Sequence, residues 1–221
     1  MNVLTILRSV EELLYEVMSW LLFYPLTLWK TLRRPLATMA YSDREQRDKP
    51  EKQYLETLSP PLFLVLSILL AHAVEVVFGL KTADAGSSIG RLITENEQVL
   101  LGFRALMFSL PGLIFAGMAL KLSGKRLDRE NLRAPFFAQC YLSGTTAILV
   151  SLGTTGVRYP SEVATLIGLV AILAVTLWYL AVQWLWLKRE TPLKRLAAVA
   201  VTIAGFACSM LLVVLSGLLI A

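Results

Sequence analysis

Five long apolar segments constrain this chain more than any other feature. They fall at residues 60–80, 98–120, 134–153, 162–187 and 196–220. Each reaches about 20 residues, the length with which an α-helix crosses the hydrocarbon core of a bilayer. The chain is 56% hydrophobic and only 17% charged, with a mean hydropathy of +0.64, which is more apolar than ordinary soluble domains. We therefore expect an all-α fold, a polytopic membrane bundle of five transmembrane helices.

The basic residues alternate between the two sides of this predicted bundle. Eight precede the first span, and the successive loops then carry two, five, one and four. By the positive-inside rule, the N-terminus lies in the cytoplasm and Ala221 lies outside. We interpret the basic excess as a signal of orientation in the cell inner (plasma) membrane. The partner that it indicates is the lipid bilayer, and we expect no nucleic acid.

Residues 1–34 are predicted to form an amphipathic or interfacial helical segment. One face repeats apolar residues at steps of four and three, namely Val3, Leu7, Val10, Leu14, Val17 and Leu21. The apolar run 17–29 contains Pro25 and is too short to span. Aromatic rings followed directly by Lys30, Arg33 and Arg34 are typical of the headgroup level. We expect this helix along the cytoplasmic face, and an equal alternative is that its apolar stripe packs on the bundle.

Residues 35–59 carry many charges of both signs and no sustained apolar period. A mixed-charge stretch of this kind is usually solvated. We predict a solvated charged linker between the amphipathic helix and the transmembrane domain, 60–221.

Three charged or titratable residues stand inside the first two predicted spans. His72, the single histidine, and Glu75 lie three residues apart on one helical face, and Arg104 lies in the second span. At ~1.5 Å per residue, Glu75 is about 7 to 8 Å from the outer end at Leu80, and Arg104 is about 9 Å from Gln98. Because a lone charge at such depth is costly, we predict a Glu75–Arg104 ion pair. His72 has no assigned partner, and Glu75 or a third-span hydroxyl could accept its hydrogen bond.

The third predicted span is unusually polar. Together with the charged trio, its polar residues form our candidate intramembrane polar site. That site comprises His72, Glu75, Arg104, Gln139, Tyr141, Ser143 and Thr145. In a structural interpretation, the trio holds an ion pair that fixes the first two spans against each other. The hydroxyls of the third span then form hydrogen bonds between helices. A functional interpretation makes the trio a proton or substrate site beside a polar cavity.

Several classes of site are not indicated by the sequence. It contains no phosphate-binding loop, no paired metal-ligand motif and no nucleophile elbow, so we expect no cofactor and no metal. An intramembrane enzyme with His72 as base is conceivable, but no nucleophile or second base accompanies it, and we do not expect catalysis. In the fifth span, Ala200, Ala204 and Cys208, with Gly205 and Ser209 beside them, predict a close-packing face.

The layout resembles the Yip1-like family of five-span membrane proteins. The resemblance rests on the polar third span, APFFAQCYLSGTTAILVSL, and on the passage WYLAVQWLWLKRETPLKRLAAV between the last two spans. The chain lacks a DLYGPFW-like motif before its first span, so no residue role carries over. The resemblance implies either a permease-like protein, as bacterial members are commonly labelled, or a protein that binds partners in membrane trafficking.

Two functions follow as hypotheses. The first is a permease-like protein that binds or moves a small solute, a lipid headgroup or a proton at the intramembrane site. The alternative is a non-transporting scaffold or interaction subunit that recruits partners through the N-terminal helix. A homodimer or other membrane-protein partners fit either hypothesis.

Overall fold

The computed structural model describes residues 3–49, 52–80 and 87–220. These ranges hold eight helices and no strand: α1 Val3–Arg33, α2 Pro35–Glu45, α3 Pro60–Val77, α4 Ser88–Thr94, α5 Glu97–Leu122, α6 Arg129–Arg158, α7 Glu162–Glu190 and α8 Arg195–Ile220. Five of them, α3, α5, α6, α7 and α8, are long and apolar enough to cross a membrane. The predicted all-α, multi-pass architecture is therefore confirmed.

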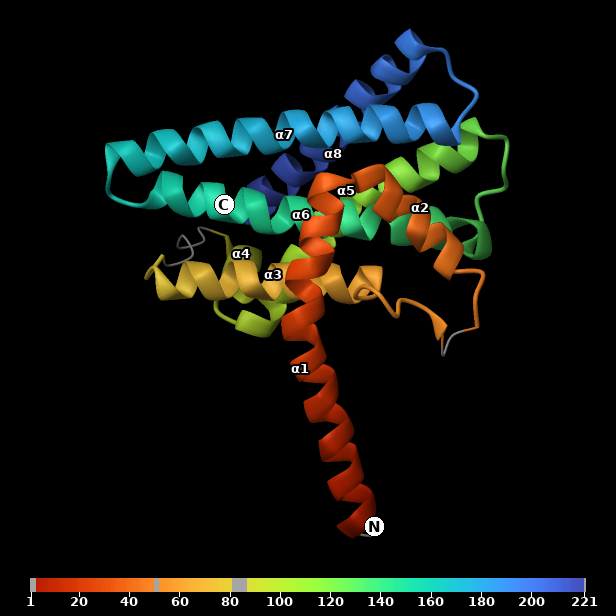
Figure 1. The fold of residues 1–221 in the computed structure, drawn as a ribbon. Helices are drawn as coiled ribbons and strands as arrows, with labels where there is room; N and C mark the ends of the chain where they lie inside the picture. Colours follow the sequence, from red (N-terminus) through yellow and green to blue (C-terminus); the bar gives the residue numbers. More distant parts are fainter. Residues whose placement is uncertain (1–2, 50–51, 81–86, 221) are drawn as a thin grey trace.

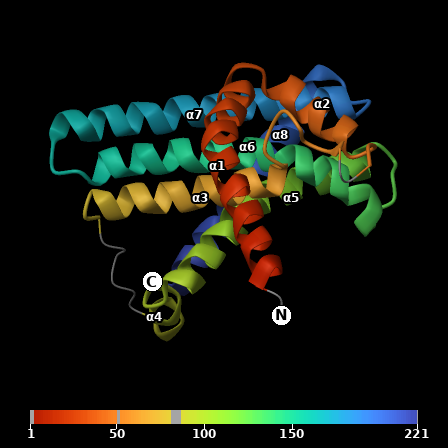
Figure 2. The ribbon, with the colours of Figure 1, turned by 60° about the horizontal axis from the view of Figure 1, so that its bottom comes forward.

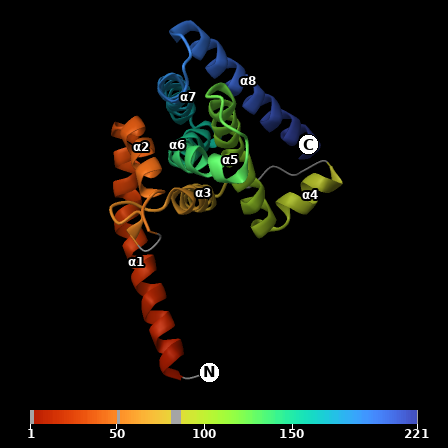
Figure 3. The ribbon, with the colours of Figure 1, turned by 90° about the vertical axis from the view of Figure 1, so that its right-hand side faces the viewer.

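Helix α6 occupies the centre of the bundle. It packs against α3, α5 and α7 and also against the short α2 (Figure 1). Helices α3, α6 and α7 run side by side in Figures 1 and 2, whereas α5 and α8 are inclined to them. Seen along that shared direction in Figure 3, α1 lies across the bundle axis and its N-terminal part extends away from the other helices. In a protein whose long helices cross the bilayer, α1 thus lies in the membrane plane.

The helix ends differ from the predicted spans in ways that local chemistry explains. Helix α3 stops at Val77 instead of residue 80, because Gly79 adopts a φ of +66° and the amide of Leu80 donates to the Glu75 carbonyl oxygen. Helix α6 begins earlier than predicted, where the Asp128 side chain accepts from the amide of Asn131, and it continues through the expected turn to Arg158. Residues 81–86 of the predicted loop 81–97 lie outside the described ranges, and α4 occupies part of the remainder.

Glycines bring α6 and α7 into backbone contact. A Cβ added at Gly168 of α7 would overlap the carbonyl oxygen of Gly153 and would lie 2.7 Å from the amide nitrogen of Val157. A Cβ at Gly156 would lie 3.3 Å from the Gly168 Cα. Such close approach between helices is the usual packing device in lipid, where there is no hydrophobic drive for helices to associate. The predicted third span ended at Gly153, whereas Gly153 and Gly156 both lie inside α6 and serve this contact.

The predicted close-packing face of α8 is confirmed for Gly205 and Ser209 and is wrong for the other three residues. Ala200, Ala204 and Cys208 are exposed on the bundle. The small residues that face inward are Ala198, Thr202, Gly205 and Ser209. Gly205 lies against Phe115 and Met118 of α5, where an added Cβ would come within 3.1 Å of both side chains.

The predicted solvated linker 35–59 is wrong for its first half. Residues Pro35–Glu45 form α2, which docks on α6 with Met39 and Ser42 fully buried. Met39 joins the core cluster that contains Phe115 and Trp186. The segment was misjudged because two or three buried side chains on an eleven-residue helix give too weak an apolar period to detect.

Part of helix α1 packs on the bundle, as one of its two alternatives predicted. Near its C-terminal half, Trp20, Phe23, Tyr24 and Leu28 pack on Phe63 and its neighbours in α3 and α6, and the Tyr24 hydroxyl donates to Ser67 Oγ at 3.1 Å. Residues 9–18 are exposed, apolar side chains included. One end of α1 is therefore fixed to the bundle, and the exposed residues 9–18 are not covered by it.

The glycine contact between α6 and α7 makes a direct stability prediction. We expect Gly168→Ala to lower the free energy of unfolding by about 2 kcal/mol or more, because the added methyl meets backbone atoms that cannot move aside. Gly117→Ala in α5 is the matched control, since a Cβ there meets nothing within 4 Å and the change should be neutral or stabilising. Thermal unfolding of both variants in detergent measures the difference, and equal stabilities would contradict the packing described here.

Candidate functional site

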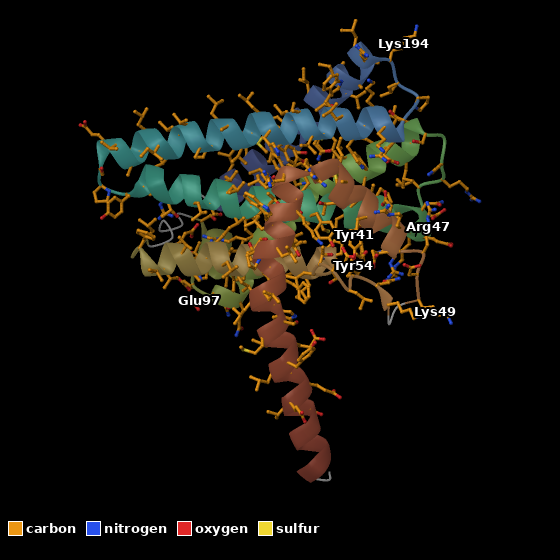
Figure 4. All side chains as sticks on the ribbon, in the orientation of Figure 1. Tyr41, Arg47, Lys49, Tyr54, Glu97 and Lys194 are labelled. Atoms are coloured by element: carbon orange, nitrogen blue, oxygen red, sulfur yellow. The ribbon has the colours of Figure 1, made fainter. Side chains whose placement is uncertain are left out.

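The charged trio of α3 and α5 comes together as one cluster. Arg104 Nη2 donates to Glu75 Oε2 at 2.7 Å, so the predicted ion pair is formed. The two side chains are only 19% and 11% exposed in the isolated bundle. The cluster lies near the C-terminal end of α3, and Arg104 follows two turns after Glu97, which is labelled in Figure 4.

His72 has a contact that the sequence did not assign. Arg104 Nη1 lies 3.5 Å from His72 Nδ1, at the long end of hydrogen-bond range. A guanidinium group only donates, so in this contact the Nδ1 atom of His72 is on the accepting side. Arg104 therefore links the carboxylate and the imidazole.

The polar residues of α6 do not join this cluster. Side chains two positions apart on a helix point about 200° apart, so alternate residues cannot line one wall of a cavity. Gln139 and Ser143 share one face, where both would contact a Cβ added at Gly112 of α5. Tyr141 points the other way and hydrogen-bonds to the carbonyl oxygen of Leu58 at 2.7 Å.

These α6 side chains are instead committed to structure. Gln139 and Gln183 of α7 exchange amide hydrogen bonds at 3.0 and 2.7 Å, and the Gln183 amide also donates to the Tyr179 hydroxyl at 2.8 Å. Tyr141 additionally shares a 2.8 Å hydrogen bond with Thr57. Thr145 is fully buried, and its hydroxyl has no hydrogen-bond partner in the part of the chain described. The candidate site thus separates into the charged trio, the hydrogen bonds that Gln139 and Tyr141 make to other segments, and the buried hydroxyl of Thr145.

A different hollow lies where α1, α2 and the approach to α3 meet. It has a volume of about 340 Å³, and we call it the basic pocket. Its lining residues are Trp29, Lys30, Arg33, Arg34, Ala37, Thr38, Tyr41 and Thr57. Sequence reasoning noted the three cations as a headgroup-level cluster but missed the pocket, because its far wall belongs to the unpredicted helix α2.

Positive charge dominates the basic pocket. None of its lining side chains carries a carboxylate, although Lys30 pairs with Glu56 beside it at 3.4 Å. The Arg33 guanidinium lies 4.8 Å from the Trp29 ring centroid, a cation–π contact that fixes its orientation. Figure 4 places Tyr41 at the side of the bundle where α2 lies. Such a pocket offers two guanidinium groups to an anion.

Comparisons of this chain with family models, with curated proteins and with solved structures found no match. The geometry of the molecule is therefore the basis for its proposed function.

The charged trio predicts an asymmetry between single and double substitutions. Glu75→Gln leaves the buried Arg104 without its counter-ion and should lower stability by about 3 kcal/mol. Replacing both, Glu75→Gln with Arg104→Gln, removes the uncompensated charge and should recover most of that loss. Thermal unfolding in detergent compares them, with Glu162→Gln at the exposed start of α7 as control. Arg104→Gln alone completes the cycle, and a double variant that loses as much stability as the two single variants together would contradict coupling between Glu75 and Arg104.

Proposed function

We propose that this chain is a non-transporting membrane scaffold that binds the phosphate headgroup of an anionic phospholipid in the basic pocket. The observation that carries the proposal is a 340 Å³ hollow with three cations and no lining carboxylate, at the fixed end of an in-plane helix. A bound headgroup would hold α1 and α2 together at the membrane surface. The exposed part of α1 is then the element that meets the bilayer surface and partner proteins.

The chemistry of the lining suits a lipid better than a soluble anion. Trp29, which is half-exposed, and Tyr41 both line the pocket, and tryptophan and tyrosine are the ring types that settle at the membrane interface. Arginine side chains bind phosphate oxygens in pairs. Anionic lipids also raise the local concentration of phosphate groups around any basic cluster at the surface.

The location of the protein belongs to the same proposal. We place the chain in the inner (plasma) membrane with its N-terminus in the cytoplasm, because the basic loops all fall on one side of the bundle in sequence. Anionic lipids are attracted to that side. The Yip1-like resemblance is likewise proposed; it is compatible with a partner-binding function and equally with a permease-like one, and it assigns no residue.

Neutralising the basic pocket tests the proposal. Each Lys or Arg near an anionic surface contributes about 1 kcal/mol, so Arg33→Gln with Arg34→Gln should weaken binding of phosphatidylglycerol about 30-fold. Short-chain phosphatidylglycerol is titrated into detergent-solubilised protein, with tryptophan fluorescence as readout because Trp29 lines the pocket. The matched control also removes two positive charges, Arg44→Gln with Lys49→Gln, both exposed and outside the lining. Equal losses in both variants would leave only nonspecific charge attraction and overturn the proposal.

A second function is favoured by one observation, the linked Arg104, Glu75 and His72 inside two spans. In the permease-like hypothesis, this cluster binds a proton or solute during transport. Glu75→Gln then abolishes proton-coupled uptake or efflux in proteoliposomes at unchanged protein level, and a pH-sensitive dye inside the vesicles measures it. Under the scaffold proposal, the wild-type chain moves no protons above the rate of empty vesicles.

A further inference from the structure

A larger hollow lies at the same end of the bundle as the basic loops. It has a volume of about 620 Å³ and is enclosed by α2, the C-terminal ends of α5 and α7, and the start of α6. We call it the mixed-charge hollow. Its lining residues are Asp43, Gln46, Arg47, Ala119, Leu120, Ser123, Lys125, Glu130, Asn131, Arg133, Ala134, Pro135, Trp186 and Glu190. Arg47 is labelled at this end in Figure 4.

The charges around the mixed-charge hollow balance and do not pair. Three cations, Arg47, Lys125 and Arg133, face three carboxylates, Asp43, Glu130 and Glu190. In the described ranges, the ion pairs within 4.0 Å are Lys30–Glu56 and Glu75–Arg104, and neither belongs to this hollow. A lining that is neutral overall but carries unpaired charges of both signs complements a zwitterion.

Asp43 supplies the most specific feature of the lining. Its Oδ1 is buried from solvent and accepts no hydrogen bond from any described residue. Burial, aided by Glu190, raises the pKa of this carboxyl to about 6, although Arg47, Lys125 and Arg189 oppose the shift. A buried acceptor without a donor is costly. A ligand that brings an N–H or O–H donor to this oxygen therefore gains binding free energy.

An apolar groove continues from the mixed-charge hollow over α5 and α6. The two share Glu130 and Arg133, and the groove adds Arg129 and four apolar side chains, Leu113, Leu132, Phe136 and Phe137. The Arg133 guanidinium lies 5.3 Å from the Phe137 ring centroid at the boundary between them. A polar hollow that opens into an apolar groove has the two halves of a phospholipid site.

From this arrangement we infer that the mixed-charge hollow binds the headgroup of an aminophospholipid such as phosphatidylethanolamine, with the acyl chains in the adjoining groove. The primary ammonium donates to Asp43, and Arg47, Lys125 and Arg133 surround the phosphate. This site is separate from the basic pocket, and its inference does not rest on the proposed function.

The inference distinguishes three headgroups. Phosphatidylethanolamine carries one phosphate charge and an ammonium with three N–H donors, which matches both the neutral balance and the unpartnered Asp43 oxygen. The trimethylammonium of phosphatidylcholine has the same charge but no N–H donor. Phosphatidylglycerol has no cation to place beside Asp43 and Glu190.

Native mass spectrometry of the full chain in mild detergent tests the inference. We add phosphatidylethanolamine, phosphatidylcholine and phosphatidylglycerol with identical acyl chains at pH 7.5 and measure the bound fraction. Phosphatidylethanolamine should bind at least fivefold more tightly than phosphatidylcholine, and Asp43→Asn should remove that preference. Asp48→Asn, an exposed aspartate outside the lining, should keep it. Equal binding of the first two lipids to the wild-type chain overturns the inference.

A second variant guards against a folding defect in Asp43→Asn. Lys125→Gln replaces an exposed side chain and should weaken all three lipids severalfold without changing the preference for the ethanolamine headgroup. Soluble O-phosphoethanolamine forms a further arm of the test. Displacement of the lipid at millimolar concentration supports recognition of the headgroup alone, and absence of displacement supports a site that also needs the acyl chains.

The same measurement has a pH signature. Protonation of Asp43 removes the carboxylate that receives the ammonium, so the preference should fall as the pH decreases from 7.5 through about 6. The other charged groups that face Asp43 are Glu190, Glu130, Arg47, Lys125, Arg133 and Arg189. His72, the single histidine of the chain, lies towards the opposite end of the bundle, near the C-terminus of α3. If the Asp43→Asn variant still prefers phosphatidylethanolamine, and this preference still changes with pH over the same range, the role of Asp43 is contradicted.

Discussion

Close contact between α6 and its neighbours is the constraint on which the rest of the structure depends. Lipid tails are as apolar as leucine, so burying leucine between two spans gains little, and helices associate through tight packing and interhelical hydrogen bonds. The chain supplies both along α6. Gly144 lies against Phe63, Gly153 and Gly156 meet Gly168, and Gln139 exchanges hydrogen bonds with Gln183. From the sequence, the polarity of α6 could indicate a polar cavity. In the structure, the polar side chains of α6 bind this central helix to its neighbours.

Because these polar groups are committed to packing, the chemically available groups lie at the two ends of the bundle. One end carries the compact trio of Arg104, Glu75 and His72, in which each charge is already satisfied. The other end carries two hollows whose charges are largely unsatisfied, the basic pocket and the mixed-charge hollow. Their electrostatic difference follows from composition, since α1 contributes only cations to its pocket, whereas α2, α6 and α7 contribute carboxylates as well. The end with unsatisfied charges is where a ligand gains most from binding.

The sequence allowed the membrane class, the five spans and the Glu75–Arg104 pair to be predicted, for physical reasons that are local. Span length and depth along a helix depend only on position in the chain. The wrong predictions concern features that depend on the direction of a side chain around its helix or on docking between segments far apart in the chain. Gln139 and Tyr141 are close in sequence but point to opposite sides of α6, and Met39 belongs to a core that only α2 docking creates. Both hollows are built from helix ends far apart in the chain, so neither leaves a pattern in the sequence.

The in-plane position of α1 has a mechanical consequence for the bilayer. If its exposed residues 9–18, about 15 Å long and about 10 Å wide, lie in one leaflet, they occupy roughly 150 Å² there. The five spans, in contrast, displace lipid from both leaflets alike. In that position of α1, the protein is wider at one depth of the bilayer than at the other, a shape that fits a curved membrane better than a flat one. Because α1 is attached through Tyr24 and Phe63, bending of the bilayer and the packing of α1 on α3 act on each other.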